Sequence, residues 1–292
     1  MDFLKRFQSE RHARLLQSGA ADPSALAAAR RALVALGPEG MTIVLDTLAE
    51  HAPTPATPAT IATLVELTTE TTLARLAERL ASPVPVLADT ARATLVAALR
   101  QADGRMRGRA AEILATHAGP EVVAAVQPLA LEPDAATRRY AIEILHRACT
   151  PSATPMLLRA LEDDDWWVRE RAVDALGQAR AAEAVTPITR LLHRDPRATT
   201  ACIRALGAIA QPDCVEPLVR LAQAEDAAVR DAALRGLRAL SEAALDPGSS
   251  AVVRADGDCL RMRAQPNLQG TLIACIPDGS IVTVQAGSVA VD

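Results

Sequence analysis

The feature that most constrains this chain is an aspartate that returns at a nearly constant interval. It stands at Asp103, Asp134, Asp165, Asp195 and Asp226, which are 31, 31, 30 and 31 residues apart. Small residues follow seven places later, at Ala110, Ala141, Ala172, Cys202 and Ala233. Leucines follow eleven places later, at Leu114, Leu145, Leu176, Leu206 and Leu237. A period of this length is typical of stacked repeats, because one unit cannot bury its apolar face alone and must pack on its neighbours.

Within one unit the residue pattern predicts two helices. The carboxylate of Asp165 can accept hydrogen bonds from the free amides of a first turn, so we expect it to be an N-cap. The apolar face of the helix that follows consists of Val168, Ala172, Ala175, Leu176 and Ala179. Gly177 allows this helix to end, and a second helix is expected at 182–193. Prolines early in such second helices, where a missing N–H costs little, are Pro155, Pro187 and Pro217.

A known repeat family resembles this pattern. Residues 164–177, with the sequence D-D-W-W-V-R-E-R-A-V-D-A-L-G, are similar to the HEAT-like repeats first described in phycobilisome lyases. The arginine of this motif recurs four places after the aspartate as Arg107, Arg138, Arg169 and Arg230, with Thr199 as the exception. The resemblance implies antiparallel helix pairs, with the first helices on the convex side and the second helices on the concave side. The predicted fold class is therefore an all-α, right-handed, armadillo-like α-solenoid.

The array is predicted to span residues 23–240, and its pattern is clearest over 103–240. Two further helix pairs are expected upstream, at 23–51 and 57–82. The helix expected at 84–101 is either a first helix with a degenerate partner or the second helix of a unit that begins near Thr72. The sequence leaves these two pairings open.

Residues 1–22 are predicted to form an N-terminal capping helix. Its apolar residues are Phe3, Leu4, Phe7, Leu15 and Leu16. A cap is expected because an uncapped array exposes a layer of apolar surface. The alternative is an anchor on a membrane surface, which is less favoured because the apolar face is short and its basic neighbours alternate with acidic ones.

The composition changes after residue 240, and residues 241–250 are predicted to be a linker. Residues 251–292 alternate apolar and polar residues around Asp-Gly turn signals, which is typical of strands and hairpins. The segment 260–266, with the sequence L-R-M-R-A-Q-P, resembles the bacterial SH3-like family. The closing strands of that family are absent, so the resemblance implies a partial, all-β SH3-like module.

Charge and cysteine usage limit the function classes. The 292-residue chain has a formal net charge of -4, which argues against duplex nucleic acid as a partner because phosphate neutralisation requires a basic domain. The five cysteines include no Cys-x-x-Cys pair, so they are expected to be reduced and mostly buried. Neither a signal peptide nor a membrane span is visible, and a cytoplasmic location is expected.

Three arginines form a candidate partner-binding stripe. Arg159, Arg190 and Arg220 stand twenty-five places after the repeated aspartate, each in a predicted second helix. In register they would line the concave face and bind an acidic segment through bidentate hydrogen bonds. The alternative is a solvated face on which Glu162 neutralises Arg159. The predicted partner is another protein or an acidic peptide, without a small-molecule substrate.

Trp166 and Trp167 are the two tryptophans of the chain. One of them fits the family motif and is expected to pack against the neighbouring unit. An exposed tryptophan at a loop edge is a candidate anchor for a partner, so both are candidate partner-binding residues. The alternative is a purely structural role.

No catalytic or metal-binding motif is present. No two of the five histidines have the i, i+4 spacing of a helical metal site, and the chain lacks G-x-S-x-G, Walker and G-x-G-x-x-G motifs. The pair His146 and Cys149 is better explained as a surface histidine near a core cysteine. The acidic run Glu162–Asp165 suits a loop and an N-cap. No cofactor, metal or catalytic residue is therefore predicted, and the chain is expected not to be an enzyme.

The predicted function is a non-catalytic scaffold that binds a protein on its concave face, with the SH3-like module as a second contact. Two alternatives stay open. The resemblance to a lyase repeat allows a bilin lyase-type subunit, which would be coloured after co-expression with a bilin. The SH3-like module allows binding to the cell wall or cell surface, which would require export.

Overall fold

The computed structural model describes residues 3–19, 22–51, 55–101 and 103–244, together with four short strands between residues 250 and 283. The chain divides into two compact units, residues 1–209 and 210–292. Each unit is described by itself.

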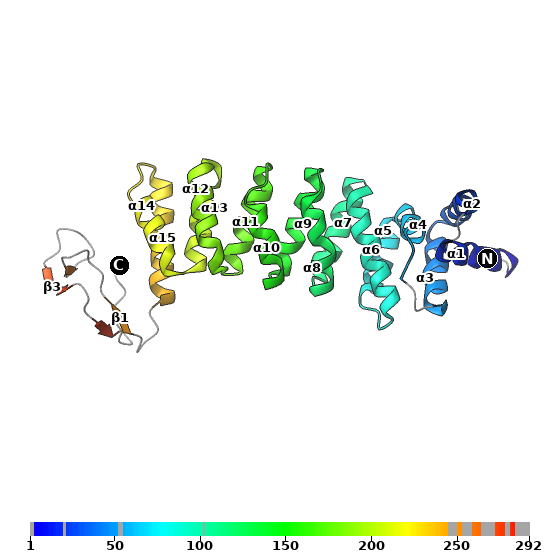
Figure 1. Ribbon diagram of the computed structural model, residues 1–292, viewed down its shortest axis with the longest axis horizontal. Helices are drawn as coiled ribbons and strands as arrows, with labels where there is room; N and C mark the ends of the chain where they lie inside the picture. Colours follow the sequence, from blue (N-terminus) through cyan, green and yellow to red (C-terminus); the bar gives the residue numbers. More distant parts are fainter. Residues whose placement is uncertain are drawn as a thin grey trace. The chain divides into compact units, whose positions relative to one another are not determined.

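The first unit is helical throughout the part that the structure describes (Figure 1). Its α-helices are α1 (Phe3–Gln17), α2 (Pro23–Val34), α3 (Pro38–His51), α4 (Pro58–Glu66), α5 (Glu70–Leu80), α6 (Pro85–Gln101), α7 (Gly104–Thr116), α8 (Pro120–Val126), α9 (Ala135–Ala148), α10 (Thr154–Ala160), α11 (Trp166–Gln178), α12 (Val185–Arg194) and α13 (Thr199–Ile209). Short 3-10 turns adjoin them at η1 (Gln127–Leu131), η2 (Pro151–Ala153), η3 (Ala182–Ala184) and η4 (Pro196–Ala198). The predicted array of helices is confirmed for this unit.

Successive helices stack in two layers. The first helices α5, α7, α9, α11 and α13 each pack on the next, and the second helices α4, α6 and α8 do the same. The small residues of the repeat are fully buried at Ala110, Ala141, Ala172 and Cys202. The repeated leucines are equally buried at Leu114, Leu145, Leu176 and Leu206. The apolar interior is thus a series of thin layers, as the period predicts, and small residues allow the helices to approach closely.

The repeated aspartates cap helices as predicted. Asp103, Asp134 and Asp165 each accept a hydrogen bond from an amide in the first turn of the following helix, at 2.9 to 3.2 Å. Asp195 accepts one from the Arg197 amide at 3.1 Å, within the η4 turn that precedes α13. Each cap satisfies amides that have no partner inside the helix.

Helix α6 is the second helix of a unit that begins with α5. It packs on α5 and α7 and stacks between α4 and α8. Thr69 caps α5 in a capping box with Thr72, so the unit begins where the second of the two open pairings placed it. The predicted pairing of the two helices within 57–82 is wrong, because α5 packs mainly on α6 while α4 belongs to the layer of second helices.

Only one face of α1 covers the neighbouring helices. The helix packs on α2 and α3, and the buried side chains are Ser9, Ala13 and Leu16. Leu4 and Phe7, which were predicted to belong to the capping face, are 66% and 59% exposed. The cap is therefore shorter than expected, because the side chains of the first turns do not reach the layer.

The second unit holds the turn η5 (Pro212–Cys214), the helices α14 (Val215–Leu221) and α15 (Ala227–Ala244), and the strands β1 (Ser250–Val252), β2 (Cys259–Arg263), β3 (Leu272–Pro277) and β4 (Ile281–Thr283). Helix α14 packs on α15. Strand β1 pairs antiparallel with β4, and β2 pairs antiparallel with β3.

The predicted linker and the predicted SH3-like module both lie in this unit. Helix α15 continues to Ala244, so the linker predicted at 241–250 cannot begin at residue 241. Residues 245–249 and much of the segment 251–292 lie outside the described residues. The two strand pairs agree with the expected strand chemistry, and the SH3-like fold stays a prediction.

Gly177 allows α11 and α13 to approach each other closely. A Cβ atom on Gly177 would lie 2.8 Å from the Cα atom of Ala205 in α13. Gly177 is buried inside α11, which continues to Gln178. The glycine thus lies one residue before the end of α11, near where the sequence placed a loosening or end of the helix, and it also allows a close contact between repeats.

We expect Gly177→Ala to lower the free energy of unfolding by about 1–3 kcal/mol, because the added methyl group overpacks the contact with α13. Gly108→Ala is the matched control, since a Cβ there would meet only the Tyr140 hydroxyl, at 4.0 Å. This second change should stabilise α7 by up to about 1 kcal/mol through helix propensity. Urea denaturation measures both, and a stabilising Gly177→Ala would contradict the close contact.

Candidate functional site

The arginine four places after the repeated aspartate connects two loops in several repeats. The Arg138 guanidinium donates hydrogen bonds to the carbonyl oxygens of Glu132 and Pro133, both at 2.9 Å. It also donates to both carboxylate oxygens of Asp163 in the next repeat, at 2.8 and 3.0 Å. The two side chains are only 14% and 10% exposed, so solvent screens this pair weakly. Arg138 therefore ties its own loop to the loop of the following repeat.

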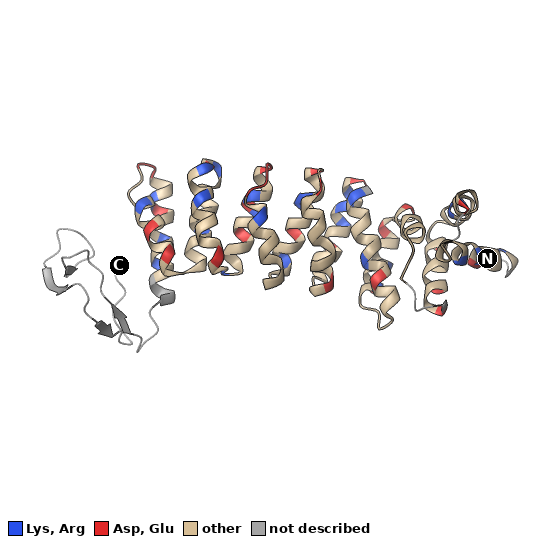
Figure 2. Cartoon of the chain, viewed as in Figure 1, with Lys and Arg blue, Asp and Glu red and all other residues tan. Residues whose placement is uncertain are grey.

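The same arrangement recurs one repeat later. Arg169 donates to the two carbonyl oxygens just before its own N-cap, at 2.7 and 3.0 Å, and to the carboxylate of Asp195. Arg107 pairs with Asp134 at 3.0 Å. Figure 2 shows basic residues of the first helices beside acidic loop residues at this edge of the layers. The arginine column of the sequence is structural, a role that its spacing alone did not reveal.

Hydrogen bonds from arginines lower the pKa of two of the repeated aspartates, Asp165 and Asp195. The hydrogen bond from Arg139 is the main cause for Asp165, and together with amide hydrogen bonds it outweighs the burial that raises the pKa. The hydrogen bond from Arg169 is the main cause for Asp195. Both carboxylates are thus ionised at neutral pH, where they hold the arginines of the preceding repeats.

Arg159 and Arg190 differ from most of their neighbours in having no carboxylate partner. Ten of the fourteen arginines between residues 103 and 209 form ion pairs. Arg159 on α10 and Arg190 on α12 are exposed, and no described residue pairs with either. Glu162, the expected partner of Arg159, pairs with Arg194 instead. The predicted neutralisation of Arg159 is therefore wrong.

Arg220, the third residue of the predicted stripe, has a different environment. It lies on α14 in the second unit, where it is exposed and pairs with Glu216 one turn earlier. Two guanidinium groups of the predicted stripe are therefore unpaired among the described residues, those of Arg159 on α10 and Arg190 on α12.

The two tryptophans at the start of α11 also differ. Trp166 is 46% exposed, whereas Trp167 is half-buried. The guanidinium of Arg171 lies 5.7 Å from the centre of a Trp167 ring and donates a hydrogen bond to Glu143 at 2.6 Å. The cation–π contact lies within α11, and the hydrogen bond of Arg171 connects this helix to Glu143 of α9. Trp166 is the one whose ring is available to a partner.

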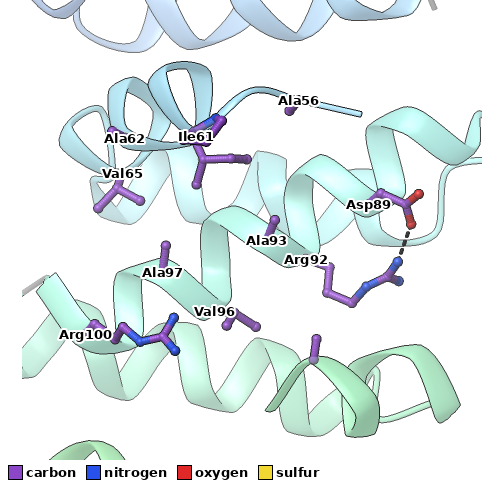
Figure 3. Close-up of a pocket in the computed structure, with 12 residues that line it drawn as sticks. Ala56, Ile61, Ala62, Val65, Asp89, Arg92, Ala93, Val96, Ala97 and Arg100 are labelled. Carbon is purple, nitrogen blue, oxygen red and sulfur yellow. Dashed lines mark hydrogen bonds and ion pairs between the residues drawn. The ribbon is translucent and has the colours of Figure 1, made fainter. Parts of the chain in front are cut away.

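Two hollows lie along the second helices. The first, of about 460 Å³, opens between α4, α6 and α8, and the ion pair of Asp89 with Arg92 and the side chain of Arg100 stand at its opposite ends (Figure 3). Its wall is mainly small and apolar, with Ala56, Pro58, Ile61, Ala62, Val65, Ala93, Val96, Ala97 and Ala125. The runs of alanine in these helices were the signal in the sequence, since small side chains leave such space unfilled.

The second hollow has a similar volume of about 460 Å³ and a polar wall. Leu131 and Met156 are its larger apolar residues, and Arg159 lines it. Arg138 and the carboxylates of Glu132, Glu162, Asp163 and Asp164 complete the wall. The unpaired Arg159 therefore lies in a depression of the surface that holds four carboxylates and two guanidinium groups, so the hollow itself does not attract an acidic side chain.

Two of the described cysteines, Cys202 and Cys214, are buried. Burial raises the pKa of Cys202 to about 12, and burial also raises the pKa of Cys214. Cys149 is exposed at the left-handed C-cap of α9, which differs from the expectation of a core residue. The side chains of Cys259 and Cys275 lie outside the described residues.

Among the described residues, no group of three or more His, Cys, Asp or Glu side chains is placed to hold a metal ion. None of the described helices is both long and apolar enough to cross a membrane.

Sequence comparison identifies the repeats in the middle of the chain. Residues 128–201 match the family of HEAT repeats, and residues 200–224 match the PBS lyase HEAT-like repeat. The resemblance of the repeat motif is thereby confirmed for this part of the chain. No curated protein matches this sequence.

Several solved structures are similar to this chain. The complex of CpcE and CpcF of phycocyanin lyase from Nostoc sp. PCC7120 is 22% identical over 52% of this chain and 65% of that chain, with a TM-score of 0.45. This chain thus spans less than two thirds of that relative. Human deoxyhypusine hydroxylase is 18% identical over 82% of this chain and 98% of that chain, with a TM-score of 0.39. A designed armadillo repeat protein is 14% identical over 80% and 98%, with a TM-score of 0.36. At these values the likeness transfers no function.

We expect Arg169→Met to lower the free energy of unfolding by about 2–4 kcal/mol, because it leaves the half-buried Asp195 and two loop carbonyls without their donor. Arg204→Met is the matched control, since Arg204 is 59% exposed in its pair with Asp174. An exposed pair contributes about 0–1 kcal/mol, so the control should change little. Equal losses in chemical denaturation would contradict the structural role of the arginine column.

Acid should weaken the cap at Asp165. Its pKa is lower in the folded chain than in the unfolded chain, so the carboxylate contributes stability that is fully present above about pH 4 and is lost as the pH falls through the folded value. Asp165→Asn removes this contribution. The difference in thermal midpoint between the native chain and the variant should therefore narrow as the pH falls from neutral to acid. A constant difference would show that Asp165 does not titrate with folding.

Proposed function

We propose that the chain is a non-catalytic scaffold for protein–protein interaction that binds an acidic segment of its partner along the second helices of the repeats. The observation that carries this proposal is the pair of exposed, unpaired guanidinium groups at Arg159 and Arg190, in a stretch where most arginines have carboxylate partners. Unpaired guanidinium groups are ready to form bidentate hydrogen bonds with carboxylates from another molecule.

The order of the helices suits an extended segment. Arg159 and Arg190 lie on successive second helices, α10 and α12, so one extended segment that runs along the second helices would pass both guanidinium groups. Many small contacts along a repeat array can then add up to a stable complex.

The proposal also covers catalysis, the C-terminal segment and the location of the protein. The chain acts without a catalytic step, which fits the high pKa of the Cys202 thiol because a protonated thiol is a poor nucleophile. The C-terminal segment provides an SH3-like second contact. The protein works in the cytoplasm, where its cysteines stay reduced.

The test uses a fluorescent Glu-rich peptide and the same peptide with every Glu replaced by Gln. The native chain should bind only the acidic peptide, and Arg159→Glu with Arg190→Glu should weaken binding roughly tenfold or more, because two charge-assisted contacts become repulsive. Fluorescence anisotropy with the full chain measures both affinities.

Arg180 and Arg197 provide the matched control. They are also exposed and without an ion pair among the described residues, but they lie in a loop and in the η4 turn. Arg180→Glu with Arg197→Glu makes the same change in net charge and should leave the affinity nearly unchanged. If both double variants lose the same affinity for the acidic peptide, binding depends only on the net charge of the chain, and the proposed surface is wrong.

A further inference from the structure

Helix α1 has two faces with different surroundings. Ser9, Ala13 and Leu16 follow one another at helical spacing and are buried against the neighbouring helices. The opposite face carries Leu4, Phe7, Arg11 and Arg14, which also follow at helical spacing. We call these four residues the α1 stripe. All four are exposed, and Figure 1 shows α1 at the N-terminal end of the row of helices.

The α1 stripe combines apolar and basic groups in a fixed order. Leu4 and Phe7 are 66% and 59% exposed, which is unusual for large apolar side chains that stand side by side. Arg11 and Arg14 continue the same line, and neither forms an ion pair with a described residue. The stripe is about 15 Å long, since an α-helix rises 1.5 Å per residue.

The charge of α1 is opposite to that of the chain. Residues 3–17 contain Lys5, Arg6, Arg11 and Arg14 against Glu10, which gives a net charge of +3. The whole chain has a net charge of -4. Helix α1 thus combines a net positive charge with the exposed side chains of Leu4 and Phe7.

We propose that the α1 stripe binds the surface of an anionic lipid bilayer. Leu4 and Phe7 insert at the boundary between headgroups and acyl chains, while Arg11 and Arg14 bind lipid phosphates. A bilayer accepts a straight, narrow stripe because many lipids adapt to it, whereas a specific protein interface needs about 20–30 residues on each side. The anionic cytoplasmic leaflet supplies the complementary charge. This surface is separate from Arg159 and Arg190.

The second unit contains a natural comparison. Val215 and Val219 on α14 are another exposed apolar pair at helical spacing, with 44% and 41% exposure. Their neighbours Glu216 and Arg220 form an ion pair, so this surface carries no excess positive charge. Apolar exposure without basic neighbours should not direct a helix to anionic lipid.

The test is sedimentation of the full chain with vesicles. The native chain should sediment with vesicles made of equal parts of phosphatidylglycerol and phosphatidylcholine. It should not sediment with vesicles made of phosphatidylcholine alone. Leu4→Ser with Phe7→Ser should lower the partition coefficient by roughly tenfold or more, because two apolar side chains no longer insert. Arg11→Glu with Arg14→Glu should lower it to a similar degree, and salt should weaken binding of the native chain.

Two control variants make the result specific. Val215→Ser with Val219→Ser should leave the partition coefficient unchanged, and so should Arg159→Glu with Arg190→Glu, so the scaffold proposal can fail independently of this one. The serine changes in α1 are at exposed positions, and unchanged thermal midpoints will show that the fold is intact. Absence of binding to anionic vesicles, or equal binding by the native chain and the Leu4 and Phe7 variant, would overturn the proposal. It would also be overturned if that variant changed a dimer into a monomer in analytical ultracentrifugation, since a second copy would then cover the stripe.

Discussion

The ion pair between an arginine of one repeat and an aspartate of the next is the contact on which the stacked layers depend. Arg138 with Asp163 and Arg169 with Asp195 are its best shielded examples. Each arginine also binds carbonyl oxygens of its own loop, so one side chain fixes both loops. A loop at the edge of a thin layer has few apolar contacts of its own, and its polar backbone groups need partners. The arginine provides these partners and joins the loops of successive repeats.

Because most arginines of the array form ion pairs, the few that do not are available to bind a partner. Ion pairs within the array account for most guanidinium groups between residues 103 and 209, so Arg159 and Arg190 are not needed to hold it together. The α1 stripe is also not needed to hold the array together, because Arg11 and Arg14 lie on the exposed face of α1, away from the other helices. The two surfaces suit different partners. One surface is a row of separated cations, and the other is a basic helix with two exposed apolar side chains.

Much of the first unit could be predicted because its pattern is local. An aspartate before a helix, a small residue seven places on and a leucine eleven places on act through helix geometry, and all three were found where expected. The errors and omissions arose where a residue's role depends on another repeat. Gly177 lies near the end of α11, as its local properties indicate, but the sequence did not indicate its contact with Ala205. Leu4 and Phe7 are apolar, as expected of a capping face, but the buried face of α1 is formed by Ser9, Ala13 and Leu16.

The sequence by itself determined the period, the capped first helices and the thin apolar layers, since hydrogen bonds and side-chain faces within a helix involve residues only a few positions apart. Only the tertiary structure decided which arginines are paired and which are free. The decisive ion pairs join residues 25 or 26 positions apart, and their distance is set by how the repeats stack. The same applies to α1, because its free face is defined by the helices that cover its other side.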